Sequence, residues 1–194
     1  SAMYAVRSEG IDPANGRERF IKKNGLPTYT WDANDQVVVG DNNPDAQGSV
    51  GLNVAYKGFY LNASFMYQWG AQSYNETLLN KVENADVRGS NVDRRVLTQR
   101  WMNPGDIAPF YDMGNQTKTQ VTTRFVQDYD YFNFSGLSLG YDFSRELISK
   151  WRLRSLGLRF NMNDICRWST VKEERGTSYP FSRSFSFTLN IGIR

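Results

Sequence analysis

The chain has 194 residues, of which 40% are apolar and 14% aromatic, and its formal net charge is +3. A charge this mild argues against a nucleic-acid-binding protein. The sequence contains no histidine and a single cysteine, Cys166, so it has no internal disulfide and lacks the commonest general base and the commonest transition-metal ligand.

Residues 1–45 are rich in turn signals, as in DPANGRE, KKNGLP and GDNNPD. Asn, Asp, Gly and Pro favour turns, so we predict a loop region containing one small hairpin, RERFIKK against PTYTWD. Asp41, Asn43 and Asp45 have the spacing of a calcium loop, but Ala46 and Leu52 stand where that loop needs Gly and Glu. We therefore expect an Asx turn and no metal site.

The rest of the chain is dominated by segments in which apolar residues alternate with small polar ones. This period of two is typical of β-strands with two unlike faces. In SFSFTLNIGI the polar face carries no charge, whereas a water-exposed face normally carries Lys and Glu. A change of phase near Ser135–Gly136 predicts a β-bulge. The predicted strands lie at about 46–56, 59–71, 122–143, 151–163 and 181–193.

The connections between these strands alternate between short and long. YKGF is a tight turn at Gly58, and 144–150 is a short link, whereas 72–121 is a long loop with helical periodicity in ETLLNKVENADV. No run of about 18 apolar residues predicts a transmembrane helix. Strands of this length with alternating loops are typical of an outer-membrane β-barrel with long extracellular loops. About eight strands are needed to close a barrel. We therefore expect further strands, in the same polypeptide or in a companion fragment, to complete the barrel.

Five segments follow one another in order along nearly the whole chain: GIDPANGRERFIKKNG, VVVGDNNPDAQGSVGLNVAYKGFYLNASFMYQWGAQSYN, VENADV…NVDRRVLTQRW, RFVQDYDYFNFSGLSLGYDF and MNDICRWSTVKEERGTSYPFSRSFSF. Together they resemble the C-terminal part of SusC/RagA-type TonB-dependent outer-membrane transporters. The resemblance implies the C-terminal strands, about five, of a 22-stranded antiparallel barrel with a plugged lumen. It also implies import of glycan fragments or peptides, with a SusD-like surface lipoprotein as partner and TonB as energy source. The plug, the TonB box and most of the barrel have no counterpart in this sequence, and the ending IGIR departs from the usual terminal aromatic residue.

Aromatic residues fall into two groups. One group lies near strand ends, as girdle residues at membrane interfaces do, although an ordinary sandwich core remains an alternative: Tyr56, Phe59, Tyr67, Trp69, Tyr141, Phe143 and Trp151. The other group lies in predicted loops and could contact a substrate, a partner or other loop residues: Tyr74, Trp101, Phe110, Tyr111, Trp168 and Tyr179. We take the second group as candidate substrate-binding residues.

Catalysis is not indicated. The adjacent Glu173 and Glu174 have Lys172 and Arg175 as ion-pair partners, and Cys166 has no histidine to activate it. We therefore expect a transporter segment in contact with membrane lipid or lipopolysaccharide, without enzymatic activity, cofactor, metal or nucleic acid. The alternative is a soluble β-sandwich module that binds carbohydrate or peptide.

Overall fold

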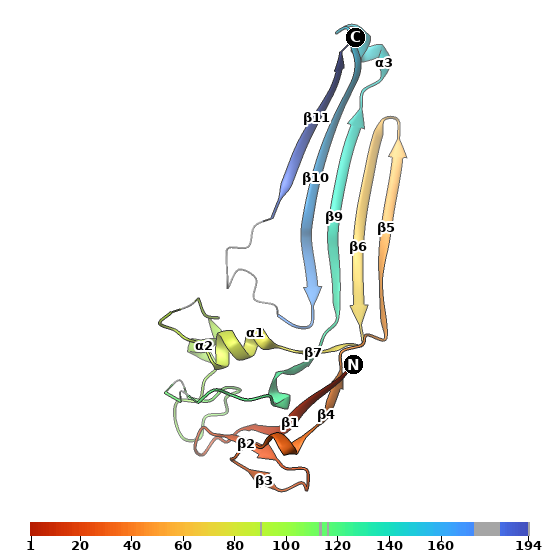
Figure 1. The fold of residues 1–194 in the computed structure, drawn as a ribbon. Coiled ribbons are helices and arrows are strands. Elements are labelled where there is room, and N and C mark those ends of the chain that lie inside the picture. The colour runs from red at the N-terminus through yellow and green to blue at the C-terminus, as the bar shows by residue number, and fades with distance from the viewer. Residues whose placement is uncertain (90, 113, 116, 173–182, 194) are drawn as a thin grey trace. The chain divides into compact units, whose positions relative to one another are not determined.

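The computed structural model describes residues 1–89, 91–112, 114–115, 117–172 and 183–193 (Figure 1). The chain divides into two compact units. The loop unit comprises residues 1–44 and 70–129 with Val171 and Lys172, and the sheet unit comprises residues 45–69, 130–170 and 183–193. The sequence predicted consecutive regions 1–45 and 46–194, whereas in the structure residues 70–129 fold with the N-terminal segment.

The sheet unit is one antiparallel five-stranded sheet with the order β11-β10-β9-β6-β5. Lys57 and Gly58 turn β5 into β6 with φ of 47° and 88°, the backbone of a two-residue hairpin. A short helix, α3 (Arg145–Ser149), links β9 to β10. The all-β fold class is thus confirmed. The strands are β5 (Ala46–Tyr56), β6 (Phe59–Trp69), β9 (Tyr131–Asp142), β10 (Leu153–Ser169) and β11 (Phe185–Ile193).

Two strand boundaries differ from the prediction. The predicted strand 122–143 breaks into a 3₁₀ turn, η3 (Thr123–Phe125), the short β8 (Val126–Asp128) and β9. Only β9 belongs to the five-stranded sheet, because β8 pairs with β7 (Gln72–Tyr74) in the loop unit. The predicted strand 151–163 continues to Ser169, since a bulge with Asp164 at φ 54° lets pairing resume at Cys166.

The loop unit contains a four-stranded sheet where the sequence predicted only one small hairpin. Its order is β3-β2-β1-β4, formed by β1 (Ala2–Ile11), β2 (Glu18–Ile21), β3 (Pro27–Thr28) and β4 (Gln36–Asp41), with the 3₁₀ turn η1 (Ala33–Asp35) before β4. The hairpin pairs Phe20 with Thr28. β1 and β4 escaped prediction because register shifts at Met3/Tyr4 and Ser8/Gly10 interrupt the alternation.

The segment predicted as a long loop has its own small core. Asn75 caps α1 (Glu76–Leu78) by accepting the Leu78 N–H at 2.8 Å. The π-helical η2 (Leu79–Glu83) and α2 (Arg95–Thr98) follow. The predicted helical face is confirmed, because Leu78 and Val82 are buried together with Val96, Phe110 and Phe125. Among the described residues, no helix is long and apolar enough to span a membrane.

Candidate functional site

One face of the sheet unit, the apolar face, is apolar across all five strands. The registers place Leu61 opposite Val54 on one side and Leu139 on the other. Directly opposed residues of an antiparallel sheet share a face. A set of residues paired in this way across all five strands therefore forms a row on one face of the sheet. Complete rows are Tyr56–Phe59–Tyr141–Leu158–Leu189, Val54–Leu61–Leu139–Phe160–Phe187 and Leu52–Ala63–Leu137–Met162–Phe185.

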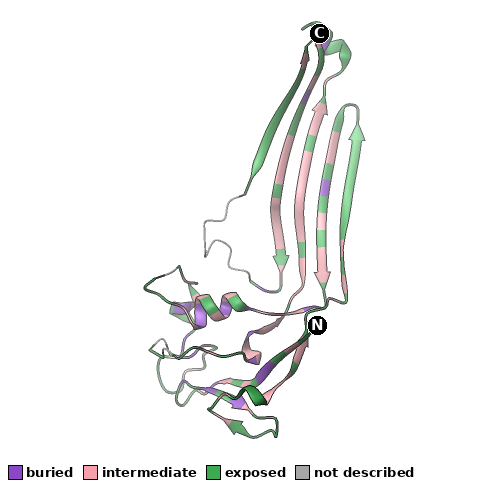
Figure 2. Cartoon of the chain, viewed as in Figure 1, coloured by how far each residue is buried: buried purple, intermediate pink, exposed green. Residues whose placement is uncertain are grey.

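The residues of the edge strands β5 and β11 are mostly exposed, whereas those of β9 and β10 are mostly of intermediate exposure (Figure 2). Phe187 is 69% exposed and Phe59 is 62% exposed. Rings pack against one another across the strands, with centroids 4.7 Å apart for Phe65–Phe134 and 4.9 Å apart for Phe160–Phe187. Each Å² of apolar surface left in water costs about 25 cal/mol relative to burial. A surface this extended therefore favours an apolar surrounding over water.

The opposite face, the polar face, is hydrogen-bonded and nearly free of acidic groups. The Ser138 hydroxyl donates to Asn161 Oδ1 at 2.8 Å, and the Asn161 amide donates to Ser186 Oγ at 3.5 Å. These side chains bind water as readily as they bind one another. The complete row across the sheet is Asn53–Asn62–Ser138–Asn161–Ser186.

A cation lies on the polar face beside a ring. The guanidinium carbon of Arg159 lies 5.5 Å from the centroid of the Tyr60 ring, a cation–π distance. The Tyr60 ring in turn lies across Gly140, where an added Cβ would come within 1.8 Å of the ring. The polar face thus needs a glycine on β9 to seat this pair.

The bulge predicted near Ser135–Gly136 is confirmed. Ser64 pairs with Gly136 and Phe65 pairs with Phe134, so Ser135 is the extra residue. Its hydroxyl donates to the Ser64 carbonyl at 2.9 Å. The inserted residue keeps Phe134 on the same face as Leu137 despite their odd spacing, and so preserves the apolar face over the full length of β9.

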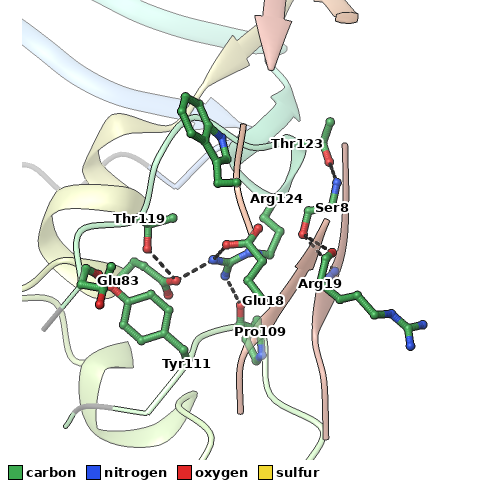
Figure 3. A network of polar contacts seen from close by, with 12 residues as sticks. Ser8, Glu18, Arg19, Glu83, Pro109, Tyr111, Thr119, Thr123 and Arg124 are labelled. Carbon is green, nitrogen blue, oxygen red and sulfur yellow. Dashed lines mark hydrogen bonds and ion pairs between the residues drawn. The ribbon is translucent and has the colours of Figure 1, made fainter. Parts of the chain in front are cut away.

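The loop unit is organised around a buried ion cluster formed by Glu18, Glu83 and Arg124 (Figure 3). Arg124 Nη2 lies 2.7 Å from Glu18 Oε2 and 2.6 Å from Glu83 Oε1, and Nη1 donates to the Pro109 carbonyl at 2.7 Å. The Thr119 hydroxyl donates to Glu83 at 3.2 Å. The cluster therefore joins β2 to η2 and to the segment that precedes β8.

Burial and charge act in opposite directions on this cluster. Burial opposes the charge of Arg124, but its hydrogen bond to Glu18 and the charge of Glu83 outweigh this and raise the pKa of Arg124 above its ordinary value. Burial raises the pKa of Glu83 above 4.5, and Arg124 offsets only part of that rise. Arg124 therefore keeps its charge, whereas the pKa of Glu83 lies above its ordinary value.

A second buried arginine, Arg100, binds backbone rather than carboxylates. Its Nη1 donates to the Tyr111 carbonyl at 3.2 Å, and its Nη2 donates to the Glu83 carbonyl at 2.7 Å and to the Val82 carbonyl. Guanidinium donors of this kind satisfy carbonyls that no strand or helix partner reaches. Arg100 therefore holds η2 against the segment around Tyr111.

Most of the predicted substrate-binding aromatics serve the packing of the loop unit instead. Phe110 is 3% exposed, and Tyr111 is 5% exposed with its hydroxyl bonded to the Thr117 carbonyl at 2.8 Å. Tyr74 packs on Phe125 with centroids 5.9 Å apart. The Trp101 indole N–H donates to the Pro13 carbonyl at 3.0 Å. Phe110 is thus wrong as a residue that presents a ring to a ligand, whereas Tyr111, although nearly buried, also lines a groove in the loop unit.

The remaining two candidates have different outcomes. Trp168 is 59% exposed but lies in β10, and its ring is 5.9 Å from that of Phe132 on the apolar face. It was assigned to a loop because the bulge at Asp164 obscured the continuation of the strand. Tyr179 lies outside the described residues.

Two aromatic residues that the sequence did not single out, Tyr29 and Trp31, line a groove in the loop unit. They stand two residues apart in TYTW, immediately after β3 ends at Thr28. That spacing was the available signal, but the surrounding turn residues led us to assign the segment to a hairpin only.

The interpretation of Asp41 as an Asx-turn residue is confirmed, since Asp41 Oδ1 accepts the Asn43 N–H at 2.9 Å. Within the described part of the chain, no group of three or more Cys, Asp or Glu residues is arranged to hold a metal ion. The structure therefore offers no metal-centred candidate in that part.

No family model matches the chain, and no curated protein sequence matches it. It is similar to a chain in the structure of the RagAB peptide importer in the 'open-open' state, with a TM-score of 0.69, 17% identity, and coverage of 91% of this chain and 19% of that one. In the 'closed-closed' state the TM-score is 0.66, with 17% identity and coverage of 91% and 20%. The chain thus shares its fold with a segment of those proteins and spans about a fifth of their length.

Proposed function

We propose that this chain forms C-terminal barrel strands of a SusC/RagA-type TonB-dependent outer-membrane transporter that imports glycan fragments or peptides. The observation that carries the proposal is the exposed apolar face, complete across five strands and backed by a face of mostly small, hydrogen-bonded polar residues. A barrel wall in a membrane has lipid on one side and an aqueous lumen on the other, and it needs this pairing of faces.

The lengths of the strands support the same function. β5 and β6 have 11 residues each, β9 has 12 and β11 has 9, and about 9–11 residues cross a bilayer as a tilted strand. β10, with 17 residues, would continue past the membrane surface.

Aromatic rings near both ends of the apolar face support a membrane placement. Near one end Phe59 and Tyr141 have centroids 4.2 Å apart, and near the other Tyr67 and Trp69 have centroids 4.8 Å apart. Aromatic girdles at the two interfaces are typical of outer-membrane barrels. In this proposal the girdles contact lipid or lipopolysaccharide head groups, and the strands between them contact the hydrocarbon core.

The proposed mechanism is binding and gating without covalent chemistry. The polar face lines the lumen, and the loop unit lies outside the cell beneath a SusD-like lipoprotein. TonB acts through the plug of the complete transporter. The neighbouring structures are of a peptide importer, which supports a short peptide as cargo, and exposed aromatics suit glycan fragments equally well.

A soluble β-sandwich module is the alternative. A sandwich needs a second sheet packed on the apolar face, and the described residues of the sheet unit form one sheet only. The alternative predicts a monomer that is stable in buffer without detergent. Such a result with the apolar face buried would overturn the proposal.

Cysteine labelling of the two faces tests the proposal directly. In a Cys166→Ser background, Phe187→Cys and Ser186→Cys place one thiol on each face of β11. In outer membranes containing the complete transporter, Phe187→Cys should react with a membrane-soluble maleimide and resist a charged one. Ser186→Cys should react with the charged reagent, and equal labelling of both positions by it would contradict the proposal.

A further inference from the structure

The loop unit contains a groove of about 490 Å³ that the proposed function does not use. It lies between the segment that carries Tyr29 and Trp31 and the segment 117–120. All of its lining residues belong to the loop unit, so its shape does not depend on the sheet unit. A concave site with aromatic walls and a few polar groups is a typical small-ligand site.

Hydrogen bonds, not burial, hold the aromatic walls. The Trp31 indole N–H donates to the Val121 carbonyl at 3.2 Å. The Tyr29 hydroxyl donates to Asp12, and the guanidinium carbon of Arg17 lies 5.1 Å from the Tyr29 ring centroid. Tyr29 as a whole is 38% exposed. The walls are therefore positioned before a ligand arrives, which lowers the entropic cost of binding.

The charge of the groove is positive. Arg17 and Lys118 both line it, and neither forms an ion pair with a residue that the structure describes. Glu18 also lines the groove, but its Oε2 is bound by Arg124 at 2.7 Å and its side chain is buried. The accessible charges at the groove are thus two cations, which attract an anion.

We propose that this groove binds a small carboxylate-bearing ligand, with the carboxylate at Arg17 and Lys118 and an apolar or ring-shaped body against Tyr29 and Trp31. Guanidinium and ammonium donors make charge-assisted hydrogen bonds to carboxylates, and aromatic faces pack against rings and aliphatic groups. The terminus of a short peptide and the acid group of a uronic sugar share this chemistry. As a cargo site the groove rests on the proposed function, but binding to it is measurable without transport.

Calorimetry on the detergent-solubilised complete transporter tests the proposal with two matched pairs of probes. One pair is N-acetyl-Gly-Phe as the free acid and as the C-terminal amide, and the other is digalacturonate and its dimethyl ester. At least one acid should bind, on the order of tenfold more tightly than its neutral partner, the effect of one charge-assisted hydrogen bond. Raising the salt concentration from about 0.05 to 0.5 M should weaken binding of the acid more than binding of its neutral partner. Which acid binds identifies the source of the carboxylate.

Variants separate the charged part of the groove from its walls. Lys118→Gln should weaken binding of the acid on the order of tenfold and leave binding of the neutral partner unchanged. Arg17→Gln should weaken binding of the acid more than binding of the neutral partner, because Arg17 also contacts the Tyr29 ring. Trp31→Leu should weaken binding of the acid and of its neutral partner alike. Lys23→Gln is the matched control, because Lys23 is an exposed cation of the same unit outside the groove, and it should have no effect.

Equal binding of an acid and its neutral partner would overturn the proposal, as would no binding of either acid. An equal loss in Lys23→Gln and Lys118→Gln would also overturn it. These outcomes leave the labelling of Phe187→Cys and Ser186→Cys untouched, so failure of the groove is distinguishable from failure of the membrane placement.

Discussion

Arg124 is the residue on which the interior of the loop unit depends. It pairs with two carboxylates and a carbonyl, and its own side chain is 10% exposed. Arg124→Met should destabilise the loop unit by about 3–5 kcal/mol, because it leaves Glu18 and Glu83 buried without a cation. Amide hydrogen exchange across residues 70–129 of the intact protein measures this loss.

The matched control is Arg19→Met. Arg19 pairs with Glu9 in the four-stranded sheet of the loop unit, but both side chains are exposed. Exposed pairs contribute little to stability. We expect no measurable change in exchange. Equal protection in both variants would mean that the buried cluster does not stabilise the unit.

Glu83 makes the stability of the loop unit depend on pH. Its pKa is raised by burial, so the folded state binds this proton more tightly than the unfolded chain does. The contribution of Glu83 to the free energy of unfolding therefore falls as pH rises from its ordinary value of 4.5 through the raised folded value. Glu83→Gln should remove this dependence, and hydrogen exchange at several pH values measures it.

The opposite slope would contradict this prediction. If the difference between wild type and Glu83→Gln grows in favour of wild type with rising pH, then pairing with Arg124 outweighs the cost of burial. The geometry of the cluster would stand, but the direction assigned to Glu83 would be wrong.

At the scale of the element, the β5–β6 hairpin depends on Gly58. Its φ is 88°, and an added Cβ would lie 2.5 Å from the Asp142 carbonyl oxygen. Gly58→Ala should therefore destabilise the sheet by about 1–3 kcal/mol, through backbone strain and contact with β9. Urea unfolding of the detergent-solubilised protein measures the loss.

Gly51→Ala is the matched control within the same hairpin. No atom lies within 4 Å of a Cβ added at Gly51, and a strand alanine has less freedom to lose than glycine. We expect unchanged or slightly increased stability. A loss as large as that of Gly58→Ala would show that the effect is not specific to the turn.

For the whole molecule, the two faces of the sheet should tolerate charge differently. Leu189 lies on the apolar face of β11 and is 58% exposed, whereas its neighbour Thr188 lies on the polar face. In a membrane, Leu189→Arg should destabilise the assembled transporter by up to about 2–4 kcal/mol, depending on depth, because arginine is costly in hydrocarbon. Thr188→Arg should assemble normally. The yield of folded protein in outer membranes distinguishes the two variants, and equal yields would argue against lipid contact.

Much of the sheet unit could be predicted from the sequence. The alternation in GLSLGYDF and SFSFTLNIGI specifies strands and faces, and the change of phase at Ser135 specifies the bulge. These signals are local, because the side-chain period of a strand is fixed by its backbone. The predicted strands fail only where a bulge interrupts the pairing, as at Asp164, or where a strand segment joins another sheet, as at Val126.

The loop unit could not be predicted in the same way. Its strands carry bulges, its helices have three to five residues, and its core is assembled from distant segments. The hydrogen bond between Arg124 and Glu18 joins residues 106 positions apart, and no local sequence pattern predicts such a contact. For the same reason the burial of Phe110 and the exposure of Tyr29 were not foreseen.

The sequence by itself determined the two-faced strands, because hydrophobic alternation and strand geometry share one period. Only the tertiary structure decided which rings are available to a ligand. Exposure depends on which segments meet: Phe110 is buried against Val96 and Phe125, whereas Tyr29 and Trp31 line a groove together with residues 117–120. Burial of that kind is a property of long-range contacts, which the order of residues alone does not display.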